Sequence, residues 1–204
     1  MFWLHLAADL HGVVLLLDGK KHLFMGKQQQ HLTSELIAFI NQQNMFFVAT
    51  AMLEGRINLS PKGIDSLRII NDKSVAWLNL TGSGNETATH LRNDPRMTLM
   101  FCAFEGNPRI VRIYGTAKVF HPRDAEWDKL ISIFPQIPGS RQIIDLKIEL
   151  VQTSCGMGVP YMDYKEERDQ LPKWAENKGK EGLQEYMKLK NTTSLDGYPT
   201  GIFE

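Results

Sequence analysis

The chain has 204 residues, of which 43% are apolar, so it can build a substantial core and global disorder is excluded. Its 23 basic residues balance 23 acidic ones, and a neutral chain without a basic run is a poor candidate for binding nucleic acid or an anionic membrane surface. The two cysteines are too few for a disulfide framework or a four-cysteine metal site and are typical of a cytoplasmic protein.

The first residues of the chain differ in character from the rest of it. Their longest apolar run, Val13 to Leu17, is far shorter than the roughly 20 residues that span a membrane. No basic residue precedes that run and Asp9 lies upstream of it, which is unlike a signal peptide. We therefore expect residues 1–30 to be an N-terminal extension, with Met25 as an alternative start.

From Thr33 onward the pattern predicts one helix and then a series of short strands. Leu36, Ile37 and Ile40 recur at helical spacing, and Thr33 can cap the first turn. Apolar stretches between turn residues predict at least six strands, at 45–51, 56–60, 67–70, 74–80, 96–104 and 109–120. A short helix over 86–92 lies among them. Short strands with brief turns favour an antiparallel barrel over alternating strand–helix units.

The last third of the chain combines a strand with helices. Residues 124–134 show an amphipathic helical pattern, and residues 143–151 alternate as in a half-exposed strand. The charged tail from Tyr164 is predicted to be helical. The fold class is therefore mainly β with helices, with a barrel domain over 31–153 and a C-terminal loop and helical tail over 154–204 that packs on the barrel or on a dimer.

Two glycine-containing segments offer groups that bind anions. The turn Ser-Pro-Lys-Gly at 60–63 can aim its hydroxyl and its ammonium at one anion, or it is a surface turn with a solvated lysine. The loop 81–87 leads into a helix, where main-chain N–H groups with Asn85 and Thr87 suit a phosphate. Such side chains also cap helices without any ligand. The loop lacks the Gly-Lys-Ser/Thr sequence of a Walker motif.

Other reactive side chains are less organised. Arg112 needs a partner or an open face of its strand, because Val111 and Ile113 point to the opposite side. Cys155 is either an exposed thiol or a small packed residue. The six histidines show no ligand spacing, so we expect no metal, and no Gly-x-Ser-x-Gly hydrolase motif is present.

In combination these segments resemble the pyridoxamine 5'-phosphate oxidase-like, FMN-binding split-barrel family. The resemblance spans residues 46–120 and is carried, in order, by Phe46–Thr50, Ile57–Gly63, Val75–Asn79, Gly82–Thr87, His90–Met97 and Val111–Ala117. The tail segments 153–160 and 191–200 resemble a branch of that family described only as flavin-nucleotide-binding.

The resemblance implies a six-stranded antiparallel split barrel that forms a homodimer with FMN at the subunit interface. Lys62 would approach the flavin or its phosphate, while Leu78 and Asn79 would meet the ring system. Arg112 would reach the ring edge. With the Ser60 hydroxyl of the turn, and with the two phosphate-facing side chains of the loop, the expected cofactor-binding residues are Ser60, Lys62, Leu78, Asn79, Asn85, Thr87 and Arg112.

The chain also departs from the family pattern. The oxidase has an arginine at the position of Ile57 and a basic pair at Glu86 and Thr87, and this chain has none of these charges. Phosphate binding then rests on Lys62, main-chain N–H groups and hydroxyls, or on a residue of the tail. The oxidase's C-terminal substrate signature is absent as well, which disfavours oxidation of a pyridoxine phosphate.

We therefore expect a cytoplasmic FMN-binding flavoprotein, an oxidoreductase that passes electrons from a small-molecule donor such as a nicotinamide to a small acceptor. No catalytic side chain is assigned, because the flavin itself carries the redox chemistry. The alternative function is a flavin or haem carrier without turnover. A thiol-dependent enzyme using Cys155 is a third hypothesis.

Overall fold

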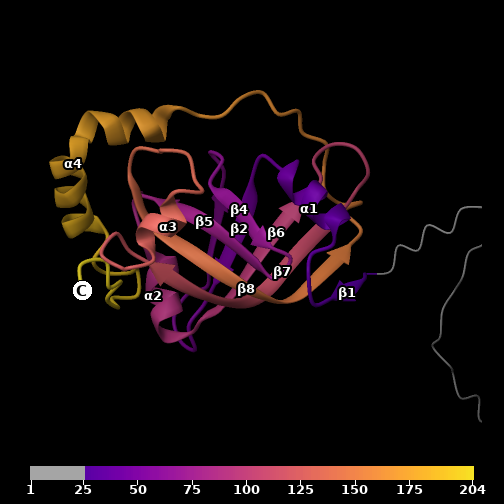
Figure 1. Ribbon diagram of the computed structural model, residues 1–204, viewed down its shortest axis with the longest axis horizontal. Coiled ribbons are helices and arrows are strands. Elements are labelled where there is room, and N and C mark those ends of the chain that lie inside the picture. The colour runs from indigo at the N-terminus through magenta and orange to yellow at the C-terminus, as the bar shows by residue number, and fades with distance from the viewer. Residues whose placement is uncertain (1–25) are drawn as a thin grey trace, which may run out of the picture.

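Residues 26–204 are described by a computed structural model, in which one antiparallel sheet curls around the core and four helices lie at its margins (Figure 1). The expected extension and alternative start at Met25 lie outside the described residues. The strands are β1 (Gln28–Gln29), β2 (Phe46–Thr50), β3 (Asn58–Lys62), β4 (Leu67–Asn71), β5 (Ser74–Leu80), β6 (Arg96–Cys102), β7 (Ile110–Phe120) and β8 (Ser140–Ser154). The helices are α1 (Ser34–Asn41), α2 (Glu86–Asn93), α3 (Trp127–Ile131) and α4 (Gln170–Lys190).

The sheet confirms the predicted fold class, a mainly β split barrel of antiparallel strands. Its strand order is β3-β2-β6-β7-β8-β5-β4, with β1 added to β8. Within the described chain this makes eight strands, not the expected six. One of the additional strands is β1, which has two glutamines and no apolar alternation to reveal it and forms only by pairing with Val151 and Gln152.

The long strand β8 organises the sheet. It pairs with β7 along almost its whole length, with β5 through its first half and with β1 near its end. It begins three residues earlier than the predicted strand, because Arg141 and Gln142 interrupt the expected alternation although both are buried. Gly115 lies at a register shift opposite β8, where a Cβ atom would overlap the carbonyl oxygen of Lys147.

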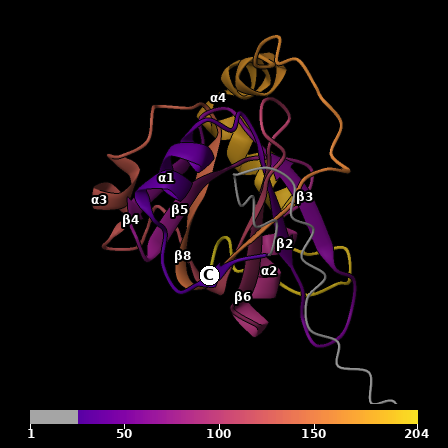
Figure 2. The ribbon, with the colours of Figure 1, turned by 90° about the vertical axis from the view of Figure 1, so that its right-hand side faces the viewer.

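Two apolar clusters hold the sheet together. The larger one lies inside the curl, where Val48, Leu99 and Ile113 have no exposed surface, and α1 closes it with Leu36 and Ile40. In Figure 2, α1 lies with β4 and β5 on one side of the view, and β2 and β3 lie on the other. The smaller cluster lies on the other face of the sheet, and its buried members are Ala76, Leu78, Phe120, Phe134 and Ile143.

The helices follow the sequence expectations unevenly. Thr33 caps α1 as predicted, since its hydroxyl accepts a hydrogen bond from the Leu36 N–H. The helix predicted over 124–134 is wrong in extent, because α3 has only five residues and buries none of them. Hydrogen-bonded turns take up its first half, where the Asp124 carboxylate accepts from the His121 N–H and the Asp124 carbonyl from the Trp127 N–H.

Strand β3 lies two residues later than the predicted strand 56–60 and contains Pro61, which the sequence analysis placed in the turn at 60–63. The sheet tolerates the missing N–H because β3 is an edge strand and pairs with β2 alone. As a result Asn58, Ser60 and Lys62 share one face of β3 and are partly buried, whereas Leu59 and Pro61 are exposed on the other.

After β8 the chain runs over the barrel as an extended segment, 155–169, and then forms α4 (Figure 1). Gly179 has a φ of 63° and kinks α4. The C-terminal segment 191–204 then returns to the barrel beside α2, where the Thr89 hydroxyl donates to the Pro199 carbonyl. No helix within residues 26–204 is long and apolar enough to cross a membrane.

Candidate functional site

A cavity of about 400 Å³ lies where the ends of β3 and β5 meet the loop 81–85 and the first turn of α2. Six of the seven expected cofactor-binding residues line it: Ser60, Lys62, Leu78, Asn79, Asn85 and Thr87. The lining residues that the sequence reasoning did not single out include Arg141 of β8 and Leu171 of α4. The fold therefore brings together side chains from four separate parts of the chain.

Lys62 supplies one positive charge to this cavity. It lies on the partly buried face of β3, with its ammonium 5.2 Å from the centre of the Trp77 ring. Burial, and secondarily the nearby Arg141 guanidinium, lower the pKa of Lys62 from 10.5 to about 8. The chain leaves β3 through Ile64 and Asp65, whose φ values of 59° and 48° place backbone strain at the rim of the cavity.

The β5 residues lie in the floor of the cavity and are already engaged. Leu78 belongs to the smaller apolar cluster, and its N–H donates to the Ser66 carbonyl at 2.8 Å. The Asn79 side-chain amide donates to Gln142 at 2.9 Å, and Gln142 is hydrogen-bonded in turn to His121 at 3.1 Å. These contacts fix β5 against β8 and leave the neighbouring loop and β3 to provide the free polar groups.

The loop before α2 holds an asparagine that does not behave as a helix cap. Asn85 occupies the N-cap position and is 2% exposed, yet its side chain makes no capping hydrogen bond. Both its side-chain oxygen and its side-chain nitrogen are buried without a partner, as is the Ser60 hydroxyl across the cavity. Thr87, by contrast, accepts a hydrogen bond from Asn58 at 3.2 Å. The purely structural interpretation of this loop therefore does not account for Asn85.

Arg141 is the cavity residue that the sequence reasoning missed. It is 5% exposed, and its guanidinium donates to the Asn191 side-chain oxygen and to the Gly84 carbonyl, both at 2.7 Å. Its Nε atom is buried without a partner, and burial lowers its pKa to about 10. The available signal was a basic residue two positions before the predicted strand 143–151. Among residues 26–204, neither Arg141 nor Lys62 forms a salt bridge with an acidic side chain.

Arg112 lies elsewhere. It occupies the face of β7 opposite to the core residues Val111 and Ile113, as its strand parity predicted. Its guanidinium donates to the Ser154 hydroxyl of β8 at 3.1 Å. It does not line the cavity around Lys62, so within one subunit the fold does not bring it to the other six residues.

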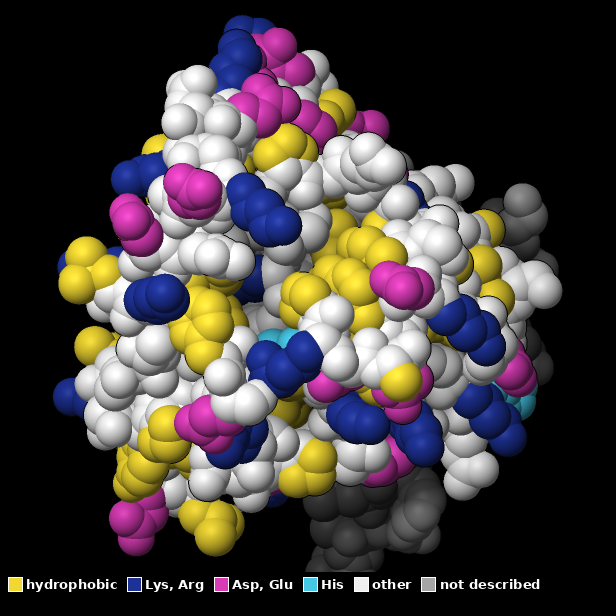
Figure 3. All heavy atoms as spheres, turned by 60° about the vertical axis from the view of Figure 1, so that its left-hand side comes forward, with side chains coloured by type: hydrophobic (Ala, Val, Ile, Leu, Met, Phe, Trp, Pro, Cys, Tyr) yellow, Lys and Arg dark blue, Asp and Glu magenta, His cyan; other side chains and the backbone are white. Residues whose placement is uncertain are grey.

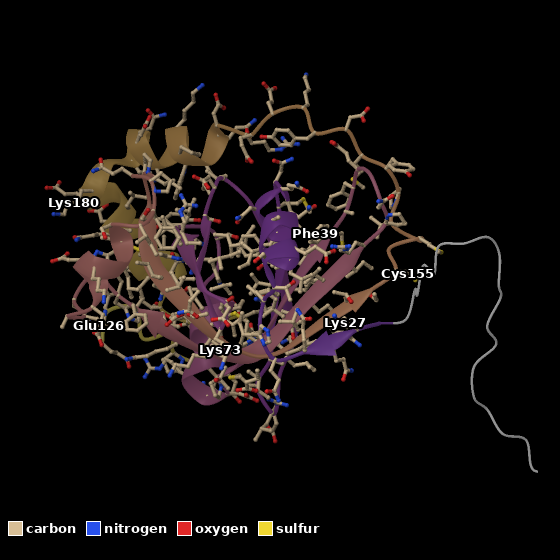
Figure 4. All side chains as sticks on the ribbon, turned by 45° about the vertical axis from the view of Figure 1, so that its right-hand side comes forward. Lys27, Phe39, Lys73, Glu126, Cys155 and Lys180 are labelled. Carbon is tan, nitrogen blue, oxygen red and sulfur yellow. The ribbon has the colours of Figure 1, made fainter. Side chains whose placement is uncertain are left out.

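The cysteines are separated from this cavity. Cys155 is exposed just beyond β8, on the opposite side of the view from Lys180 of α4 (Figure 4). Cys102 is buried, and burial raises the pKa of its thiol. No group of three or more His, Cys, Asp or Glu side chains within 26–204 could hold a metal ion. The face in Figure 3 intersperses basic and acidic side chains around hydrophobic patches, without a broad area of one sign.

The chemistry of the cavity is that of an anion site. Two cations and several hydrogen-bonding groups converge in this cavity, and its one acidic lining residue, Glu86, accepts a hydrogen bond from the Leu195 N–H. Buried polar atoms ordinarily have partners. Within residues 26–204, five buried side-chain polar atoms have no partner, and four of them belong to residues that line the cavity: Ser60 Oγ, Asn85 Oδ1, Asn85 Nδ2 and Arg141 Nε. The fifth is Trp77 Nε1, outside the cavity lining. Hydroxyl, amide and guanidinium groups are the donors that bind phosphate oxygens. The residues present therefore fit the phosphate of a nucleotide-like ligand.

Comparison with known proteins places the chain among relatives. The family model described as Pyridoxamine 5'-phosphate oxidase matches residues 32–155. The pyridoxamine 5'-phosphate oxidase family protein ustO of Aspergillus flavus is 38% identical over 191 residues, which cover 83% of this chain and 76% of that protein.

Several solved structures are similar to this chain at lower identity. A putative pyridoxamine 5'-phosphate oxidase from Lactobacillus delbrueckii is 23% identical with a TM-score of 0.49, covering 60% of this chain and 94% of that one. HutZ, a haem storage protein from Vibrio cholerae, is 16% identical with a TM-score of 0.43, covering 60% and 95%. An FAD binding protein from Mycobacterium smegmatis is 11% identical with a TM-score of 0.45, covering 61% and 96%. These likenesses are too distant to identify a ligand.

Proposed function

The chain belongs to the pyridoxamine 5'-phosphate oxidase family, and from this premise we propose that it binds FMN in the cavity beside Lys62 and acts as an oxidoreductase. The barrel over 31–153 would carry the flavin, and the loop and tail over 154–204 would complete its site. The observation that carries the proposal is made among residues 26–204: one cavity is lined by residues with four buried polar atoms that have no hydrogen-bond partner, and by two cations that have no acidic partner.

The residues of this chain would bind and orient the flavin. Lys62 would attract the phosphate or the electron-rich edge of the ring, and its partial burial strengthens that attraction compared with an exposed lysine. Ser60 and Asn85 would donate hydrogen bonds that they lack in the ligand-free protein. When bound, a flavin supplies hydride and single-electron chemistry, so no acid or base from the chain is needed to explain an oxidoreductase.

A homodimer is the second part of the proposal. Leu59 on the outer face of β3 is 64% exposed, and Ile57 just before the strand is 77% exposed, whereas the opposite face of β3 lines the cavity. Apolar residues grouped in this way favour contact with another protein surface. Since Arg112 does not line the cavity of its own subunit, it would reach a flavin only across a symmetric interface. Size-exclusion chromatography with light scattering should then give twice the chain mass.

Titration of the purified protein with FMN tests the proposal directly. Flavin fluorescence should be quenched on binding, and the double variant Lys62→Ala with Thr87→Ala should bind at least about 10-fold more weakly, since charge-assisted and neutral hydrogen bonds are lost together. Lys147→Ala, on the exposed face of β8, is the control and should bind as the wild type does. A wild-type protein that takes up no FMN would refute the proposal.

Turnover is measured on the FMN-loaded protein. NADH and NADPH consumption is followed with oxygen and other small acceptors, and reoxidation of the photoreduced flavin is followed in parallel. Turnover with one donor supports an oxidoreductase. Tight binding without turnover for any donor would favour the carrier function in its place, and binding of haem to the exclusion of FMN would reject the flavin.

A further inference from the structure

Two basic residues line the cavity and could bind the phosphate of its ligand. The family's cations at the positions of Ile57, Glu86 and Thr87 are missing, and Ile57 is 77% exposed on the outer side of the β2–β3 connection. Lys62 is one remaining cation, and Arg141 of β8 is the other. The two are close enough for Arg141 to disfavour the charge of Lys62. Two positive charges close together in a partly buried cavity repel each other, and a bound anion would offset this repulsion.

Arg141 is poorly explained as a purely structural residue. A buried guanidinium is ordinarily balanced by a carboxylate, and here its described partners are a neutral amide and a main-chain carbonyl. Its Nε donor is left buried and unpaired. A buried donor without a partner is destabilising. A phosphate oxygen would accept from the Nε–H and would also balance the charge of the guanidinium.

Asn191 holds Arg141 in place and ties it to the loop. Asn191 has no exposed surface, its side-chain oxygen accepts from Arg141, and its side-chain nitrogen donates to the Gly82 carbonyl at 2.9 Å. Because Arg141 also donates to the Gly84 carbonyl, the two residues together fix both glycines of the loop before α2. The loop that offers Asn85 to the cavity is therefore set by a residue that comes after α4.

The C-terminal segment that begins with Asn191 is anchored independently at several points. The Leu195 N–H donates to the Glu86 carboxylate at 3.1 Å, Asp196 pairs with Arg56, and Arg123 donates to the Gly201 and Ile202 carbonyls at 2.8 Å. The segment thus contacts two residues that line the cavity, Arg141 and Glu86, without lining it itself. Asn191 acts from it as a positioning residue.

Resting on the proposed function, we infer that Arg141 is the principal phosphate-binding cation of this chain and that Asn191 of the C-terminal segment positions it. The family's basic residues at the positions of Ile57, Glu86 and Thr87 are missing here. Arg141 of β8 supplies the positive charge in their place. The site is then incomplete without the C-terminal segment, and it selects ligands that end in a phosphate over the same ring system without one.

The test compares FMN with riboflavin, which lacks the phosphate, on the full-length protein. Arg141→Gln should weaken FMN binding about 10- to 100-fold, the range for a lost charge-assisted hydrogen bond, and leave riboflavin binding unchanged. Arg141→Lys should restore part of the FMN preference. The matched control is Arg123→Gln, since Arg123 also binds the C-terminal segment but does not line the cavity. It should retain the wild-type ratio of FMN to riboflavin affinity.

Asn191→Asp decides the matter if Arg141→Gln fails to fold. The substitution keeps the size of the side chain and gives Arg141 a carboxylate partner. It should therefore reduce the preference for FMN over riboflavin, while a cooperative thermal unfolding transition shows that the variant is folded. An FMN to riboflavin ratio that is unchanged in every folded variant, or one that falls equally in Arg123→Gln, would overturn the inference while flavin binding stands.

Inorganic phosphate separates the two proposals. If the wild type binds neither flavin, the proposed function fails, and thermal shift with phosphate then decides the subsite. Stabilisation of the wild type by phosphate, absent in Arg141→Gln or Asn191→Asp, supports the subsite without the flavin. Equal shifts in wild type and variants, or no shift in any of them, would overturn it.

Discussion

Replacing Lys62 with methionine should make the ligand-free protein more stable and at the same time a weaker binder of FMN. Burial holds the pKa of Lys62 at about 8, so folding opposes the charged form of this side chain. Methionine has a similar length and no charge to bury. The same ammonium that would attract the phosphate is therefore a source of instability when no anion is bound.

The magnitude can be worked out from the two pKa values. A decrease from 10.5 to about 8 corresponds to about 3 kcal/mol for a fully buried group, at roughly 1.4 kcal/mol per pKa unit. Lys62 is only partly buried, and it loses its interaction with the Trp77 ring on replacement. We therefore expect Lys62→Met to raise the free energy of unfolding by about 1–2 kcal/mol at about pH 7.

The sign of the pH dependence provides the sharper test. Below pH 8 the folded and unfolded chains both carry the proton, and the full penalty is present. Between pH 8 and 10.5 the folded protein releases the proton first, so the wild type gains stability relative to the variant as the pH rises. Urea unfolding of both proteins at about pH 7 and about pH 10 should show the difference shrinking. A less stable variant, or a difference independent of pH, would refute the reasoning, and Lys147→Met should show neither effect.

Three further predictions concern the scaffold. Leu99→Ala should lower the free energy of unfolding by about 2–5 kcal/mol in a urea titration, because Leu99 has no exposed surface in the larger apolar cluster. Gly115→Ala should destabilise the β7–β8 pairing by more than about 2 kcal/mol in thermal unfolding, since its new Cβ atom would overlap the carbonyl of Lys147. Burial and the nearby Arg123 lower the pKa of His121, so the unfolded chain takes up a proton first as the pH falls below 6.5. The wild type should therefore lose stability relative to His121→Gln between about pH 8 and pH 5, measured by urea unfolding.

Matched replacements check these expectations. Leu53→Ala removes the same atoms at a site that is 92% exposed and should change stability by less than about 0.5 kcal/mol. Gly158→Ala adds a methyl group where no atom lies within 4 Å and should also be nearly neutral. Equal effects at Leu99 and Leu53, or at Gly115 and Gly158, would contradict the assigned packing. A stability difference between wild type and His121→Gln that is constant with pH would contradict the burial of a neutral imidazole.

Elements were predicted correctly where the local sequence pattern alone determines them. Strands β2 and β4 to β7 were found close to their bounds, because apolar stretches lie there between clear turn residues. Strand β3 was shifted because Pro61 normally ends a strand, and only its edge position allows it to continue. The helix over 124–134 failed because periodicity alone does not reveal that a turn at Asp124 takes up its first residues.

The sequence by itself determined the class of fold and the local chemistry of two segments, the turn that carries Lys62 and the loop that carries Asn85. Both segments are recognisable from residues that are neighbours in the sequence, namely glycine, proline and hydroxyl residues next to strands and helices. Only the tertiary structure decided that these segments share one cavity, that Arg112 lies outside it, and that Arg141 lines it while hydrogen-bonded to Asn191. Arg141 and Asn191 are 50 residues apart, and a hydrogen bond between such distant positions arises from strand order and chain return, which no local pattern records.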